Sequence, residues 1–388
     1  MFHEKPIMPQ GFSCMAKNCG IKKGDKEDLS LFYSDKPCAA AGVFTRNQVP
    51  GAPVIVGREI IKKGVLQAVV VNSKVSNVGT GQQGVENARR MGVAAARELG
   101  IDADKVIMSS TGVIAVQLPI EKVEAGLQGS SKLLQSDPMV GAKGIMTTDT
   151  YPKAISCSVG DSTLTLVGKG SGMIEPNMAT MLVYILTDAD IASPKLDEML
   201  RKAVNKSFNM LSVNTDTSTS DTCIALANGK AGSVDEEDFY SALEASCIKM
   251  TEMLARDGEG ATKLIKVNIS GALNDKEAVV FAKSMVNSPL IKTMAFGGDP
   301  NIGRILMALG KCFDNSFDLQ KLKFGINGTD IYADSNKLPF DEATVRKSIS
   351  GDPVIFDISL GLGSGEATAY GCDLTHAYID ENAAYYSS

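Results

Sequence analysis

Short apolar runs rich in β-branched residues alternate along this chain with stretches of helical periodicity, and this alternation limits the folds that the chain can adopt. Runs typical of strands occupy residues 54–56, 69–71, 164–167, 183–186, 265–269 and 279–281. Apolar residues three or four positions apart, the spacing of an amphipathic helix, occur in residues 85–99, 196–208 and 236–256. The pattern predicts a mixed α/β protein.

The length of 388 residues suggests two or three domains, on the usual scale of about 150 residues per domain. No repeat and no Pro-rich linker marks a boundary, so boundaries are poorly determined. The loops at residues 271–276 and 327–330 are the candidates for a domain boundary.

Composition excludes two classes of partner. The formal charge of −6 leaves no basic surplus to neutralise nucleic-acid phosphates or anionic lipid. The longest apolar stretches fall far short of the roughly 20 residues that a membrane-spanning helix needs. The N-terminus lacks the pattern of a secretory signal. We therefore expect a cytoplasmic protein with a small-molecule partner, and neither nucleic acid nor membrane.

Nothing in the sequence predicts a cofactor or a metal site. The eight Cys include no CxxC pair, so buried reduced thiols are expected in place of a zinc site or a disulfide framework. A GxGxxG match at residues 79–84 follows the nearest strand-like run only after seven residues, where a dinucleotide site needs a tight turn. A glycine-rich loop that begins a helix is the better interpretation.

Histidine is scarce and restricts the possible mechanisms. Only His3 and His376 occur, and we expect His3 in a mobile terminus and His376 in a structural role. A histidine-based catalytic triad is therefore disfavoured, and an enzyme built from this chain needs a different general base.

A glycine-dense loop runs into an apolar strand over residues 168–182, GKGSGMIEPNMATML. Loop glycines permit unusual backbone conformations before Thr180, and strain there favours attack by its hydroxyl on the carbonyl of Ala179. Cleavage through the resulting ester frees the α-amino group of Thr180. With an ordinary pKa of about 7.7–8.0, that amine can accept the hydroxyl proton at neutral pH. The residues alone leave open that Thr180 simply begins a buried strand.

Two other polar segments have both a functional and a structural interpretation. Ser109, Ser110 and Thr111 end a strand before Gly112, where a hydroxyl and a backbone N–H could face a developing oxyanion or could form a turn. Residues 254–263, LARDGEGATK, could contact a zwitterionic ligand or form a solvated loop.

The segment KGSGMIEPNMATML resembles the self-cleavage signature of the ornithine acetyltransferase family, the glutamate N-acetyltransferases of arginine biosynthesis. Other blocks resemble the same family in the same order: residues 10–12 with 20–23, 44–47, 52–54, 110–114, 147–150, 216–219, 255–263, and 299–301 with 303–305. The resemblance covers essentially the whole chain. It implies an α/β fold, a layered αββα sandwich with a smaller C-terminal α/β portion.

The resemblance also implies that the bond between Ala179 and Thr180 is cut. An α chain of residues 1–179 and a β chain of residues 180–388 would result, intertwined in one catalytic unit and assembled as an α2β2 heterotetramer. Thr180 is then both the residue that cleaves the chain and the nucleophile that accepts the acyl group. Thr111 and Gly112 match the family's oxyanion pair. The positions that match substrate-binding residues are Thr147 or Thr148, Lys169, Thr180, Glu259, Asn382 and Ser387.

The implied reaction is ping-pong transfer of acetyl from N2-acetyl-L-ornithine to L-glutamate through an ester on Thr180, without a metal or other cofactor. Acetyl-CoA is a second donor in some family members. Lys169 could hold the substrate carboxylate and Glu259 its distal ammonium.

Residues 74–79, KVSNVG, depart from the family's usual Gly-Asn-Ala-Asn-like run, and Ser387 replaces a frequent Thr. These departures bear on donor range and kinetics more than on the reaction class.

Two other functions fit the residues. One is an N-terminal-nucleophile aminopeptidase or amidase, in which water takes the place of glutamate. The other is a non-catalytic ligand-binding protein that remains one chain.

Overall fold

The computed structural model describes residues 2–175 and 181–383, and the chain divides into two compact units. Unit 1 comprises Met1–Gly170, Asn177–Phe208 and Thr217–Met250. Unit 2 comprises Ser171–Pro176, Asn209–Asp216 and Thr251–Ser388. The loops at residues 271–276 and 327–330 both lie inside unit 2.

The described residues of unit 1 form an eight-stranded mixed sheet with the order β4-β3-β2-β8-β7-β6-β5, and β1 pairs with β2. The strands are β1 (Phe12–Lys17), β2 (Leu29–Phe44), β3 (Val65–Asn72), β4 (Val106–Ser110), β5 (Lys153–Val159), β6 (Ser162–Lys169), β7 (Leu182–Asp190) and β8 (Thr222–Ser233). β3 is parallel to β4, and β7 is parallel to β8. The long strand β2 pairs with β3 mainly along its first half and with β8 along its second half.

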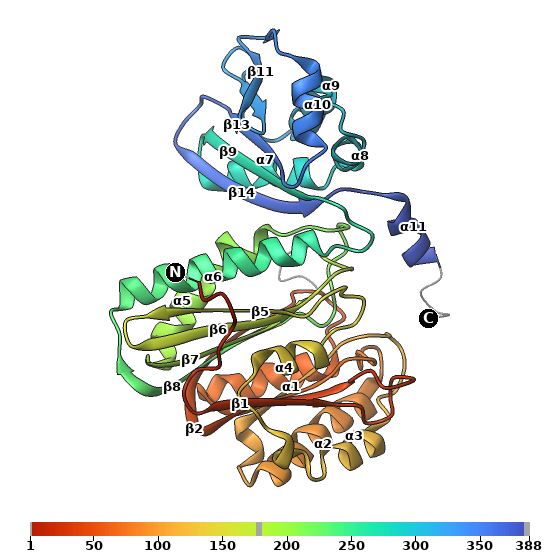
Figure 1. The fold of residues 1–388 in the computed structure, drawn as a ribbon, viewed down its shortest axis with the longest axis vertical. Coiled ribbons are helices and arrows are strands. Elements are labelled where there is room, and N and C mark those ends of the chain that lie inside the picture. Colours follow the sequence, from red (N-terminus) through yellow and green to blue (C-terminus); the bar gives the residue numbers. More distant parts are fainter. Residues whose placement is uncertain (1, 176–180, 384–388) are drawn as a thin grey trace. The chain divides into compact units, whose positions relative to one another are not determined.

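Helices cover both sides of this folded sheet. They are α1 (Ala52–Ile60), α2 (Gly81–Leu99), α3 (Ile120–Leu127), α4 (Pro138–Gly144), α5 (Ser193–Lys206) and α6 (Glu236–Arg256), of which α6 continues into unit 2 beyond Met250. Short 3-10 helices cover Ile61–Lys63, Ala103–Lys105, Ser130–Leu133 and Phe208–Met210. Figure 1 shows the resulting layers: α2 and α3, then β1 and β2, then β5 to β8, then α5 and α6, with α4 between the two groups of strands.

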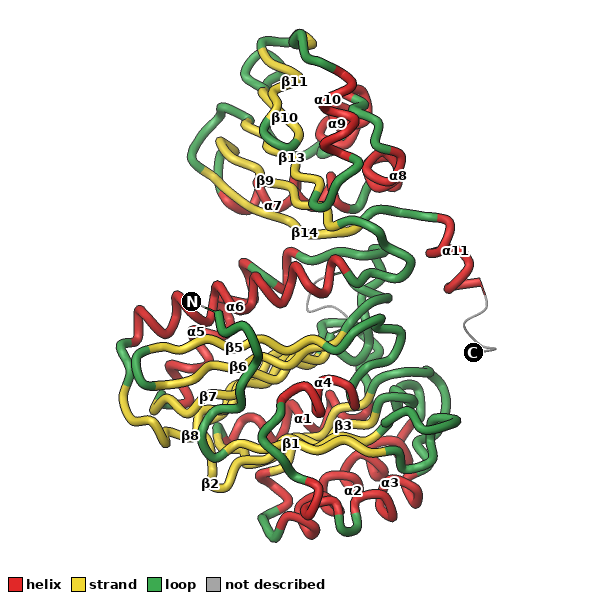
Figure 2. Tube along the Cα trace, in the orientation of Figure 1, coloured by secondary structure: helices red, strands yellow, loops and turns green. Residues whose placement is uncertain are grey.

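Two apolar cores hold these layers together. One lies between the two groups of strands that Figure 2 shows in yellow, and there the rings of Phe32 and Tyr184 lie 4.9 Å apart between centroids. The other packs Met91 and Ala95 of α2 against the outer face of β1 to β4. The predicted αββα sandwich is therefore confirmed.

Unit 2 is the smaller C-terminal α/β portion that was predicted. Its described residues form a six-stranded sheet with the order β12-β11-β10-β13-β9-β14. The strands are β9 (Leu264–Ala272), β10 (Lys323–Ile326), β11 (Thr329–Ala333), β12 (Asn336–Lys337), β13 (Val354–Ser359) and β14 (Gly365–Cys372). The helices are α7 (Asp275–Val286), α8 (Pro289–Gly297), α9 (Ile302–Gly310), α10 (Glu342–Ile349) and α11 (His376–Ala383).

Two of the predicted strands are wrong. Residues 54–56 lie inside α1, whose first turn contains Pro53, and residues 279–281 lie inside α7, which Asn274 caps with its side chain. Three apolar residues in a row carry no periodicity, so they fit a buried helix face as well as a strand. The other four predicted strands and the three predicted helices are confirmed, with shifted ends.

None of the helices formed by the described residues combines the length and the apolar composition needed to cross a bilayer.

Candidate active site

Three of the predicted site residues, Ala179, Thr180 and Ser387, lie outside the described residues. The structure therefore bears on the site through the side chains predicted to surround them. Those in unit 1 and those in unit 2 are described separately.

Lys169 is the last residue of β6, where it pairs with Leu182 at the start of β7. Its side chain is buried, and Nζ donates a hydrogen bond of 3.2 Å to the hydroxyl of Thr147. Of the two threonines predicted to contact substrate, Thr147 is thus in direct contact with Lys169, and Thr148 is half-buried beside it. The structure brings together a buried cation and a hydroxyl, a pair suited to a carboxylate ligand.

The carboxylate of Asp149 fixes this pair. Oδ1 accepts from Lys153 Nζ and from the backbone N–H of Gly170, both at 2.8 Å, and Oδ2 accepts from Thr147 N–H at 3.0 Å. Burial alone would raise the pKa of Asp149, but the charges of Lys153 and Lys169 outweigh it and hold the pKa below its usual value. The ionised carboxylate of Asp149 therefore holds the turn at Thr147 next to Gly170, the residue that follows Lys169.

Lys22 also donates a hydrogen bond to the segment around the turn at Thr147. Its Nζ donates to the carbonyls of Glu27 and Met146 and to the hydroxyl of Ser73, at 2.7, 2.9 and 2.8 Å. Ser73 in turn donates to the carbonyl of Gly144 at 2.6 Å. Burial lowers the pKa of Lys22 to about 8, and the nearby positive charge of Lys169 acts in the same direction.

Thr111 and Gly112 follow β4 at the end of the β3–β4 pair. The backbone N–H of Thr111 donates to the carbonyl of Asn72 at 3.1 Å, and the side chain of Asn72 donates to Ser110 Oγ at 2.5 Å. Ser76 donates from its hydroxyl to the carbonyl of Gly112. These contacts hold the predicted oxyanion pair in one conformation, which catalysis by preorganised donors requires.

The end of β3 links the oxyanion pair to the lysine. Asn72 contacts Thr111 through its carbonyl, and the next residue, Ser73, contacts Lys22 and through it the carbonyl before Thr147. A chain of hydrogen bonds within unit 1 therefore runs from Thr111 to Lys169.

In unit 2, the structure brings Glu259 and Asn382 together. The side chain of Glu259 is buried, and Asn382 Nδ2 donates to its Oε2 at 3.1 Å. Gly172 lies so close that a Cβ there would stand 2.2 Å from the Glu259 carboxylate. Burial and the charge of Glu259 together raise the pKa of the neighbouring Glu381. This acidic surrounding suits an ammonium group.

Two side chains of this site were missed in the sequence analysis. Lys22 and Asp149 both lie in blocks that carry the family resemblance, yet neither was assigned a role. The available signal was their type, since a charged side chain that leaves the surface needs partners.

The histidines and cysteines lie elsewhere. His3 was expected in a mobile terminus, and this is wrong: its ring nitrogens contact the hydroxyls of Ser156 and Ser158 at 3.0 and 2.8 Å. Six of the eight cysteines are buried, as predicted, whereas Cys19 and Cys312 are half-buried. Burial raises the pKa of Cys14, for example, to about 12. Over the described ranges, no three His, Cys, Asp or Glu gather as they would around a metal ion.

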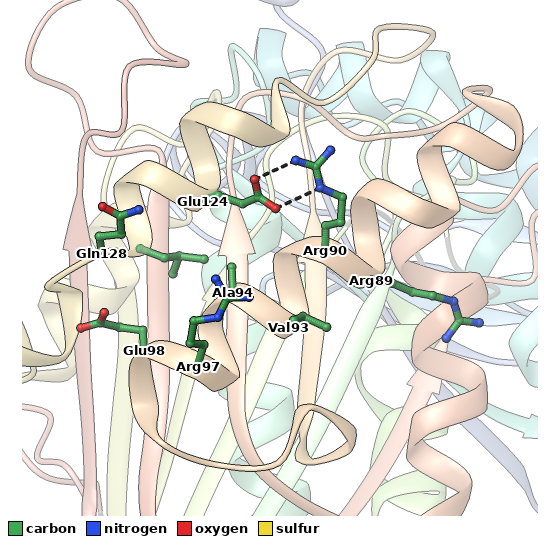
Figure 3. Close-up of a pocket in the computed structure, with 9 residues that line it drawn as sticks. Arg89, Arg90, Val93, Ala94, Arg97, Glu98, Glu124 and Gln128 are labelled. Atoms are coloured by element: carbon green, nitrogen blue, oxygen red, sulfur yellow. Dashed lines mark hydrogen bonds and ion pairs between the residues drawn. The ribbon is translucent and has the colours of Figure 1, made fainter.

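Figure 3 shows a pocket of about 450 Å³ in unit 1, formed by α2 and the neighbouring α3 and containing none of the predicted site residues. Its lining residues are Arg89, Arg90, Val93, Ala94, Arg97, Glu98, Glu124, Leu127 and Gln128. Arg90 is already paired with Glu124, at 2.7 and 2.9 Å. This pocket is therefore distinct from the predicted site.

Comparison with known proteins gives a consistent result. The model of the ArgJ family matches residues 13–387. The arginine biosynthesis bifunctional protein ArgJ 2 of Clostridium acetobutylicum is 44% identical over 382 residues, 98% of each chain. ArgJ of Rhodococcoides fascians is 42% identical over 380 residues, 97% of this chain and 94% of the relative. Glutamate N-acetyltransferase Oat2 of Streptomyces clavuligerus is 38% identical over 395 residues, 99% of this chain and all of the relative.

Among solved structures, the arginine biosynthesis bifunctional protein ArgJ of Bacillus halodurans matches with a TM-score of 0.50 and 36% identity. The match covers 53% of this chain and 98% of that chain. Sequence and structure comparisons thus lead to one group of proteins.

Proposed function

Because the chain belongs to the ArgJ family, we propose that it is a glutamate N-acetyltransferase that moves an acetyl group from N2-acetyl-L-ornithine to L-glutamate in arginine biosynthesis. The observation that carries this proposal is the likeness along almost the whole chain to proteins named for this activity, at 38 to 44% identity. The contact between Lys169 and Thr147 supports it.

The reaction begins with cleavage of the chain. The hydroxyl oxygen of Thr180 attacks the carbonyl carbon of Ala179, the C–N bond breaks, and the amide nitrogen takes up a proton. Water then hydrolyses the ester and leaves Thr180 with a free α-amino group. This amine serves as the general base, a role for which the chain has few histidines.

Acetyl transfer then proceeds in two half-reactions. The Thr180 hydroxyl attacks the acetyl carbonyl of N2-acetylornithine, its proton passes by way of the α-amine to the departing amine, and ornithine leaves. The amine of glutamate attacks the resulting ester and carries the acetyl group away. Thr111 and Gly112 stabilise the oxyanion in both steps.

Substrate binding divides between two clusters of charge. Lys169, with Thr147, holds the α-carboxylate that ornithine and glutamate share. Glu259, oriented by Asn382, holds the distal ammonium of ornithine. Thr148 and Ser387 complete the proposed binding residues. The contacts Lys169–Thr147 and Asn382–Glu259 support this division.

Cleavage would give chains of 179 and 209 residues from the 388. We propose that they remain intertwined and assemble as an α2β2 heterotetramer. The strand order supports the first point, since β7 and β8 follow the cut in sequence and lie between β2 and β6, which precede it.

Mass spectrometry of the denatured protein tests the proposal. Wild type and Thr180→Ser should give two fragments, whereas Thr180→Ala should give one chain without acetyl exchange. Thr187→Ala is the control, because Thr187 is a buried threonine of β7 whose hydroxyl donates to the Thr163 carbonyl at 2.8 Å and accepts the Ala189 N–H at 3.2 Å. It should be cleaved like wild type. An intact wild-type chain, or cleavage in Thr180→Ala, would refute the mechanism.

Use of acetyl-CoA is a separate part of the proposal. Relatives at 42 and 44% identity are named bifunctional, and we propose that this chain likewise accepts acetyl-CoA as a second donor. An assay that offers glutamate with either donor alone decides this. Release of acetate without acetylglutamate would instead indicate an N-terminal-nucleophile amidase.

A further inference from the structure

Asp221 is a buried carboxyl group with one oxygen in use and one without a partner. It directly precedes β8 and has no exposed surface. Oδ1 accepts the backbone N–H of Met181 at 3.0 Å, whereas Oδ2 has no hydrogen-bond partner among the described residues. Leaving a buried polar atom unpaired costs stability. An unpaired buried atom therefore calls for an explanation, which the other contact of Asp221 can supply.

The contact of Asp221 lies at one specific backbone position. Met181 precedes β7, and in the sequence it directly follows the proposed nucleophile, Thr180. Thr222, the residue after Asp221, donates its N–H to the carbonyl of Met181 at 3.1 Å. Two consecutive residues therefore hold Met181 by both its amide and its carbonyl, at the place where the parallel ladder of β7 and β8 begins.

Asp221 is itself fixed from the opposite side. The N–H of Thr45, beyond the end of β2, donates to the carbonyl of Asp221 at 3.0 Å, and the hydroxyl of Thr45 donates to the carbonyl of Ser218 at 2.5 Å. The backbone of Asp221 is therefore anchored independently of the bond between its side chain and Met181. It acts as a fixed point for the start of β7.

The ionisation of Asp221 is consistent with an acceptor role. Burial raises its pKa well above the usual value, while the Met181 N–H, the Thr45 hydroxyl and the charge of Lys169 act in the opposite direction. Burial prevails, so the pKa of Asp221 is raised and its protonated form is favoured relative to an ordinary aspartate. Its Oδ1 then resembles an amide carbonyl, which asparagine can reproduce.

We propose that Asp221 is a positioning residue for cleavage of the chain: by fixing the amide of Met181, it fixes the backbone beside the hydroxyl that attacks. This inference rests on the proposed function. The attack requires near-contact geometry, and a misplacement of about 1 Å can slow a reaction roughly 100-fold.

A pair of variants tests the proposal against a purely structural role. Asp221→Leu keeps the branched shape and removes the acceptor. The control is Asp188→Leu, since Asp188 is a buried acid near the far end of β7 that accepts the N–H groups of Gln10 and Thr163, at 2.8 and 2.6 Å. Both variants remove a buried acid that accepts backbone N–H groups, but only Asp221 accepts from the residue that follows Thr180. Thermal unfolding shows whether their stabilities match.

The rate of cleavage is followed by mass spectrometry of samples denatured at intervals after synthesis. We expect Asp221→Leu to be cleaved roughly 100-fold more slowly than Asp188→Leu. Asp221→Asn should recover most of the wild-type rate. If Asp221→Leu does not fold, Asp221→Ala takes its place with the same expectation.

Two results overturn the inference. One is cleavage of the Leu or Ala variant at the rate of Asp188→Leu, which would make Asp221 a stability residue only. The other is an Asn variant as slow as the Leu variant, which would mean that the reaction needs the acid itself. A wild-type chain that stays whole would refute the proposed function as well. Normal wild-type cleavage with either of the first two results refutes this inference alone.

Discussion

Gly112 lies against the backbone of Lys74 so closely that a Cβ on Gly112 would stand 2.1 Å from the Lys74 carbonyl oxygen. Its φ of +125° is also one that residues with a side chain rarely adopt. The second member of the proposed oxyanion pair is therefore a glycine for two independent reasons.

Gly112→Ala should lower acetyl transfer roughly 100-fold or more, because the clash displaces an N–H that we propose stabilises the oxyanion. It should also destabilise the fold by about 1–3 kcal/mol through backbone strain. Gly129→Ala is the control, since Gly129 has a φ of +72° but nothing within 4 Å of an added Cβ. Steady-state kinetics and thermal unfolding separate the two effects. Equal kinetic losses in both variants would argue against the oxyanion role.

Asp149→Asn should weaken both stability and substrate binding. The ion pair of Asp149 and Lys153 is fully buried, and removing one partner of such a pair costs about 3–5 kcal/mol. Because the same carboxylate fixes Thr147 and Gly170, KM for acetylornithine and for glutamate should rise together. Asp104→Asn, which breaks the exposed pair of Asp104 with Lys63, should leave both stability and KM unchanged. Chemical denaturation and initial rates provide the measurements, and an unchanged KM in Asp149→Asn would contradict the positioning role.

Lys22 should make stability depend on pH on the basic side. Its pKa is about 8 in the folded protein against 10.5 for an ordinary lysine, so between these values the unfolded chain binds more protons. The free energy of unfolding should therefore gain a contribution that rises as the pH increases from about 8 toward 10.5. Denaturant titrations at several pH values should show this contribution in wild type and in Lys23→Met, whose side chain is exposed, but not in Lys22→Met. Identical slopes in all three proteins would contradict it.

Glu259→Gln should discriminate between the two substrates. Only ornithine has a distal ammonium, and a hydrogen bond to a charged group is worth about 1.5–3 kcal/mol. KM for acetylornithine should therefore rise roughly tenfold to 100-fold, while KM for glutamate changes little. Glu342→Gln, on the exposed face of α10, is the control. A parallel rise for both substrates would mean that Glu259 does not recognise the ammonium.

The sequence was informative where a motif covered a continuous stretch. The run from β6 to β7 and the Thr111–Gly112 turn were identified from local spacing together with the family resemblance. Short apolar runs were less informative: residues 279–281 are helical because Ala278, Ala282 and Met285 continue one buried face, and a run of three residues does not show that face.

The partners of buried charges were the main feature that could not be predicted. Asp149 meets Gly170 only because β5 and β6 pair, and Lys22 reaches Met146 across more than a hundred residues. Such contacts depend on tertiary structure, and no local pattern encodes them.

The strand order has a consequence for the protein after cleavage. Strands from the second fragment would occupy the middle of a sheet whose flanks belong to the first, with ladders of hydrogen bonds on both sides. Dilution alone could not separate the fragments, because release would require both ladders to open at once. The nicked protein should melt in a single cooperative transition, and neither piece should persist in a native form without the other.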